Sequence, residues 1–137
     1  MTVMSRPTGH PAYSQTLSRE PRSAAVARRL VRTALAVWEL ESLIDDAAVV
    51  ITELVSNAVA HGRLASIRVI VARLSATRVR LSVVDRSTNA PMMRADSNGD
   101  QLRGRGLVLV DALAAGWGSE PYRWGKQVWA ELDVDAL

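Results

Sequence analysis

The feature that most constrains the fold is a change in apolar spacing at Gly62. Before it, apolar residues recur every three or four positions in two stretches, which is the pattern of helices that bury one face. After it, apolar and polar residues alternate in two short runs joined by a turn near Ser75-Ala76. That pattern predicts an antiparallel hairpin. Two helices followed by a hairpin have to bury their apolar faces against each other, so the helices are expected to form a layer on one face of the sheet.

The spacing also predicts which residues enter the core. The first helix begins near Ser23, and the second extends from about Ser42 to His61, where Gly62 ends it. Their apolar stripes are Val26, Leu30, Ala34 and Val37 in the first helix, and Ala47, Ile51, Leu54 and Ala58 in the second. The hairpin buries Ile67, Val69 and Val71 on one strand, and Val79, Leu81 and Val83 on the other.

The rest of the chain completes a two-layer pattern. An extended segment precedes the first helix, and a third helix from about Gly106 to residue 115 is followed by two more extended segments. This order predicts an α/β two-layer sandwich, with three helices on one face of a mostly antiparallel mixed sheet. We expect residues 1–10 to be a disordered lead-in and residues 11–137 to form one domain.

Composition excludes several functions. The 137 residues contain no cysteine, and the histidines are His10 and His61, which excludes disulfides, thiol nucleophiles and multi-histidine metal sites. No run approaches the roughly 20 apolar residues that span a bilayer. The first ten residues lack the apolar centre of a signal peptide, so we expect a cytoplasmic protein without a membrane partner.

The net charge of +3 makes a nucleic acid one candidate partner. However, all but one of the 17 basic residues are arginines, and they are scattered over strands, the first helix and loops. Such a distribution does not favour a nucleic-acid-binding face.

Three polar residues of the second helix do not fit the apolar stripe. Glu53, Asn57 and His61 are four positions apart, so they form one ridge beside it. The ridge is either a solvated helix edge or a row of side chains facing a ligand. An amide oxygen with a carboxylate suits Mg²⁺, which keeps several waters and takes few protein ligands. The carboxylate alternatively orients or deprotonates a nucleophile.

Asp85 and a glycine turn are the other candidates. Asp85 has the parity of the buried residues Val79, Leu81 and Val83, and a lone buried carboxylate is costly. It therefore either caps a turn or accepts a hydrogen bond from a ligand, such as an adenine amino group. The turn Gly104-Arg105-Gly106-Leu107 precedes a helix, where glycines and unpaired N–H groups can approach an anion. Arg105 and Lys126 suit either a phosphate or the surface.

Taken in order, these segments resemble the GHKL ATPases. The run from Glu53 to Gly62 is similar to their N-box, Val83-Val84-Asp85 to the first glycine box, and Gly104-Arg105-Gly106-Leu107 to the second. The resemblance covers residues 12 to 133 and is most specific to the small anti-sigma-factor serine kinases and related regulatory ATP-binding proteins of actinobacteria. It implies the GHKL (Bergerat) ATP-binding fold, with ATP and Mg²⁺ as cofactors.

The resemblance also implies roles for matching residues. Glu53 would activate or orient the phosphate acceptor, Asn57 would bind Mg²⁺, and Asp85 would hydrogen-bond the adenine amino group. The Gly104-Arg105-Gly106-Leu107 turn would bind the phosphates under a lid formed by residues 86 to 103. The acceptor would be a serine on a small anti-sigma factor antagonist protein, and a sigma factor would be the other partner. A homodimer is a further expectation.

Two departures from the family pattern keep an alternative open. After Asp85 the chain continues Arg86-Ser87 without the usual glycines, so Ser87 would lie beside the adenine. Lys126 stands where the family usually has threonine. The alternative function is a non-catalytic module of the same fold that binds ATP or a protein partner.

Overall fold

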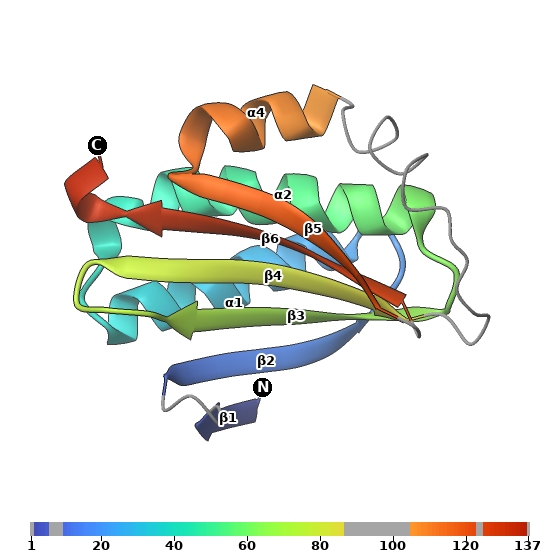
Figure 1. The fold of residues 1–137 in the computed structure, drawn as a ribbon. Helices are drawn as coiled ribbons and strands as arrows, with labels where there is room; N and C mark the ends of the chain where they lie inside the picture. Colours follow the sequence, from blue (N-terminus) through green and yellow to red (C-terminus); the bar gives the residue numbers. More distant parts are fainter. Residues whose placement is uncertain (1, 6–9, 87–104, 123–124, 137) are drawn as a thin grey trace.

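The computed structural model describes residues 2–5, 10–86, 105–122 and 125–136. Within them, the helices α1 (Ser23–Val37), α2 (Ile44–His61) and α4 (Arg105–Leu113) lie on one face of a six-stranded sheet (Figure 1). Short 3-10 turns, η1 (Glu41–Leu43) and η2 (Val134–Ala136), precede α2 and follow the last strand. The predicted α/β sandwich with three helices on one face is therefore confirmed.

The order of strands across the sheet differs from their order in the chain. From one edge to the other they are β1 (Thr2–Ser5), β2 (Pro11–Ser18), β3 (Ser66–Arg73), β4 (Arg78–Arg86), β6 (Gly125–Asp133) and β5 (Gly116–Tyr122). Every pairing between the described strands is antiparallel, so the expectation of a mixed sheet is wrong there. The reason is that only two residues separate β5 from β6, a connection too short for parallel strands, and β6 then pairs antiparallel with β4.

Strand β1 corrects part of the expectation for the first ten residues. It pairs with β2 from Thr2 opposite Ser14 to Ser5 opposite Pro11, so Thr2–Ser5 is not disordered, while residues 6–9 lie outside the described residues. Its four residues carry no strong strand pattern of their own. They are ordered by backbone hydrogen bonds to the otherwise unpaired edge of β2, and edge pairing depends little on side chains.

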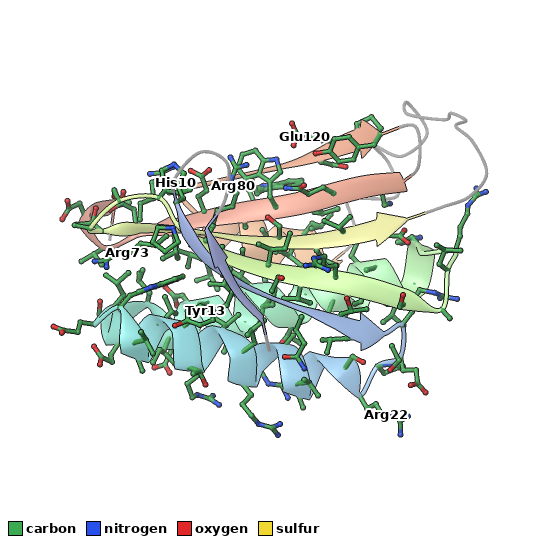
Figure 2. All side chains as sticks on the ribbon, turned by 90° about the horizontal axis from the view of Figure 1, so that it is seen from below. His10, Tyr13, Arg22, Arg73, Arg80 and Glu120 are labelled. Atoms are coloured by element: carbon green, nitrogen blue, oxygen red, sulfur yellow. The ribbon has the colours of Figure 1, made fainter. Side chains whose placement is uncertain are left out.

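The core lies between the helices and the sheet. The predicted buried residues of α2, β3 and β4 are all buried. The stripe of α1 is displaced, because Val37 is 57% exposed whereas Leu35 and Trp38 are buried. Trp38 lies just beyond the helix and packs on Tyr13 of β2, with ring centroids 5.5 Å apart, which sets the rotation of α1. Figure 2 shows Tyr13 between the sheet and the helix layer.

The opposite face of the sheet carries an ion-pair network. Arg78 Nε lies 2.7 Å from Glu131 Oε1, and Arg80 Nη2 lies 2.6 Å from Glu131 Oε2. The Arg80 guanidinium also stacks 4.2 Å from the centre of the Trp129 ring. Figure 2 shows Arg80 on the side of the sheet away from the helices. The charges of these two strand arginines are thus partly balanced within the fold. Among the described helices, none is both long and apolar enough to cross a membrane.

Candidate functional site

The polar residues singled out in the sequence come from elements that meet at one end of the sheet. The C-terminal half of α2 carries Glu53 and Asn57, β4 carries Asp85 near its end, and β6 carries Lys126 near its start. The first turn of α4 lies at the same end (Figure 1). In the antiparallel register of β4 and β6, Asp85 is directly opposite Lys126.

Asp85 is a buried carboxylate with an unused acceptor. Its side chain lies on the helix-facing side of β4, the residue is 7% exposed, and Oδ1 has no hydrogen-bond partner. Burial raises the pKa of Asp85, while the backbone N–H of Arg63 and the charges of Lys126, Arg19 and Arg63 oppose that shift. A buried acceptor without a partner costs free energy, so this position favours a ligand that donates a hydrogen bond.

Lys126 places a cation beside this carboxylate. It is half-buried, and burial lowers its pKa while the charge of Asp85 raises it. In the described part of the chain the two side chains form no salt bridge. A donor and an acceptor therefore lie on neighbouring strands without a direct ion pair between them, although their charges stabilise each other.

The side chain of Asn57 carries a second buried oxygen without a hydrogen-bond partner. Its Oδ1 is shielded from solvent and makes no hydrogen bond. Glu53, also half-buried, lies one helical turn earlier on the same side of α2. Within the described residues no cluster of three acidic or histidine side chains can hold a metal ion alone. A single amide oxygen nevertheless fits Mg²⁺, which completes its coordination with waters and substrate phosphates.

The predicted phosphate-binding turn is described only in part. Helix α4 begins at Arg105, and the first N–H groups of a helix have no partner inside it, which suits an anion. The side chain of Leu107 is 4% exposed and lies in the core, so it could meet a phosphate only through its backbone. Ser87, Gly104, the Arg105 side chain and the predicted lid beyond Arg86 lie outside the described residues.

The comparison with protein families identifies the class of domain. The family model described as histidine kinase-like ATPase domain matches residues 17–127. The chain belongs to this family. The match extends from β2 to the start of β6 and so includes α2, Asp85, the start of α4 and Lys126. No curated protein matches the chain.

Arg19 is a residue of this histidine kinase-like ATPase domain that the sequence analysis missed. Its Nε donates to the Leu64 carbonyl at 2.6 Å and its Nη1 to the Val59 carbonyl at 2.8 Å. Val59 lies in the last turn of α2, where carbonyl groups lack partners inside the helix. Arg19 therefore holds the end of the helix that carries Asn57. A single arginine after a strand has no pattern that could have revealed this contact.

Gly62 was predicted as a helix stop, but the structure gives it another reason to be glycine. Its φ of −74° and ψ of 165° are extended, so its backbone does not need glycine. A Cβ atom there would lie 2.5 Å from the Ala58 carbonyl oxygen, 2.6 Å from Arg19 Cδ and 3.1 Å from Asp85 Oδ1. Gly62 is required because the ATPase domain packs Arg19 and Asp85 against its Cα.

This packing predicts that Gly62→Ala destabilises the domain by about 1–3 kcal/mol, the usual cost of overpacking. Gly116→Ala is the matched control, because a Cβ at Gly116 meets nothing within 4 Å. Urea unfolding followed by circular dichroism measures both variants. Equal unfolding free energies for the two variants would show that a Cβ atom at Gly62 does not destabilise the domain.

Proposed function

We propose that this histidine kinase-like ATPase domain is a protein serine kinase of the anti-sigma-factor type. It binds ATP with Mg²⁺, phosphorylates a serine of a small antagonist protein and binds a sigma factor. The observation that supports ATP binding is the pair of buried oxygens without partners, Asp85 Oδ1 and Asn57 Oδ1, at one end of the sheet. A nucleotide's amino group and its metal ion supply what these two oxygens lack.

The residues divide the work of binding and reaction. Asp85 accepts a hydrogen bond from the adenine amino group, and Asn57 offers its oxygen to Mg²⁺. The N–H groups at the start of α4 bind phosphate oxygens. Glu53 orients the serine hydroxyl and accepts its proton, because it projects from the same side of α2 as Asn57. Bound ATP with Mg²⁺ supplies the reactive phosphoryl group.

The alternative is a module that binds ATP or a protein partner without phosphoryl transfer. It is supported by the position of Lys126. This residue places a positive charge beside Asp85, at the end of the site that is proposed to hold the adenine ring. The kinase and an ATP-binding module share nucleotide binding and differ only in phosphoryl transfer, whereas a module that binds only a protein partner would bind no nucleotide. Nucleotide binding is therefore the first property to test.

Asp85→Ala is expected to weaken ATP binding by about 1–3 kcal/mol, because the adenine amino group is left buried without an acceptor. GTP carries a carbonyl group in place of that amino group, so its weaker binding should change much less. Isothermal titration calorimetry with Mg²⁺ measures both nucleotides. Asp45→Ala, an exposed carboxylate at the opposite end of α2, is the control.

Two results would count against this assignment. Equal losses of ATP and GTP affinity in Asp85→Ala would exclude Asp85 as the reader of adenine. Failure of the unmodified protein to bind ATP or ADP would refute nucleotide binding itself.

A further inference from the structure

Lys126 is a cation on the same side of the sheet as Asp85. In the register of β4 and β6, Asp85 faces Lys126 and Val83 faces Val128. Val83 and Val128 are both buried in the core, and residues two apart on a strand share one face. Side chains directly opposite each other on one face have Cβ atoms about 5 Å apart. Asp85 and Lys126 therefore belong to one local site.

Part of the hydrogen-bonding capacity of this pair is unused within the described residues, although the backbone N–H of Arg63 donates to the Asp85 carboxylate. Oδ1 of Asp85 is buried without a partner, and no hydrogen bond or salt bridge joins it to Lys126. Arg19, whose charge also acts on Asp85, is held by two backbone carbonyl groups. Among the cationic side chains that the structure describes around Asp85, Lys126 is thus the one that is both half-buried and available to a ligand.

We propose, resting on the ATP-binding function above, that Lys126 reads the adenine base together with Asp85. Its ammonium group donates a hydrogen bond to a ring nitrogen next to the exocyclic amino group, and that amino group donates to Asp85 Oδ1. The exocyclic amino group of adenine lies between ring nitrogens N1 and N7, which are both acceptors. A ring held at Oδ1 therefore presents an acceptor beside its donor in either orientation.

The same pair discriminates against guanine. Guanine has a carbonyl oxygen where adenine has its amino group, and the Asp85 carboxylate repels it. A guanine turned to place its ring N–H and 2-amino groups toward Asp85 would need two acceptor oxygens. Only Oδ1 is both buried and without a partner among the described oxygens of Asp85. The donor–acceptor pair therefore suits adenine.

Base analogues test this role without relying on activity. Calorimetry with Mg²⁺ compares ADP with 1-deaza-ADP and 7-deaza-ADP, in which a C–H group replaces one ring nitrogen. The analogue that lacks the acceptor for Lys126 should bind the unmodified protein about 10-fold more weakly or worse, as expected for a hydrogen bond to a charged group. The other analogue should bind about as well as ADP.

Variants connect that difference to Lys126. Lys126→Met should weaken ADP by a similar factor and bind ADP and both analogues equally. Lys126→Gln, which keeps an uncharged donor, should retain part of the discrimination. Arg63→Met removes an exposed cation near Asp85 and should retain all of it. Circular dichroism verifies that each variant is folded.

The outcomes separate this role from the proposed function. If the unmodified protein binds ADP and both analogues equally, or if Lys126→Met keeps the discrimination, the role of Lys126 is wrong while ATP binding stands. If the unmodified protein binds GDP more tightly than ADP, adenine recognition by this pair is overturned. If it binds no adenine nucleotide, the proposed function itself fails.

Discussion

Replacing Glu53 by glutamine is expected to slow phosphoryl transfer from ATP by about 10²–10⁴-fold, the usual contribution of a positioned base. ATP affinity should remain unchanged, because glutamine keeps the size of the side chain and Glu53 is not assigned to the nucleotide. Phosphoryl transfer depends mainly on positioning and on neutralising phosphate charge. A carboxylate one turn before Asn57 is placed to accept the proton of an incoming hydroxyl, and an amide in that position cannot accept it.

The measurement is transfer of radiolabelled phosphate from ATP to small candidate antagonist proteins from the native host. Glu41→Gln, an exposed carboxylate in η1, is the control and should transfer at the unmodified rate. If the unmodified protein binds ATP and phosphorylates none of these proteins, the binding-module function replaces the kinase. A normal rate in Glu53→Gln would leave the kinase in place and remove Glu53 as its base.

Replacing Asn57 by alanine is expected to abolish the part of ATP affinity that depends on Mg²⁺, and with it phosphoryl transfer. The loss should reach at least roughly 10–100-fold, because even indirect partners of a metal site have effects of that size. The stability of the nucleotide-free protein should change little. The deleted oxygen is buried without a hydrogen bond, so its removal leaves no partner group unsatisfied.

Calorimetry with ATP, once with Mg²⁺ and once with a chelator, measures directly the part of the ATP affinity that depends on Mg²⁺. Ser56→Ala changes the neighbouring, exposed residue of α2 and should keep the full Mg²⁺-dependent part of the ATP affinity. Asn57→Asp retains an oxygen ligand and should recover Mg²⁺ dependence. If Asn57→Ala keeps the same dependence on Mg²⁺ as the unmodified protein, Asn57 is not a metal ligand.

The helices and strands were predictable where burial follows a simple period. The stripe of α2 and the alternation in β3 and β4 are confirmed, because each of these elements packs one face on the core. The prediction failed where burial or order depends on a contact with another element. Trp38 packing on Tyr13 sets the rotation of α1, and the unpaired edge of β2 orders β1. Neither effect is encoded within the segment concerned.

Some residues of the candidate site could likewise be predicted from the sequence, and others could not. Glu53, Asn57 and Asp85 stood out because each is a polar side chain in a position that the local period makes buried or half-buried. The involvement of Arg19 and the close packing at Gly62 could not be inferred, since both depend on β2, the end of α2 and the end of β4 lying together. Contacts between segments far apart in the chain leave no local pattern.

The sequence by itself determined the class of fold, the ridge of Glu53 and Asn57, and the inward face of Asp85. Helical and strand periods are local properties, and burial of their apolar faces requires a helix layer on a sheet. Only the tertiary structure decided that β6 inserts between β4 and β5 and so sets Lys126 opposite Asp85. Strand register depends on which chain segments meet, and that is decided by packing of the whole domain.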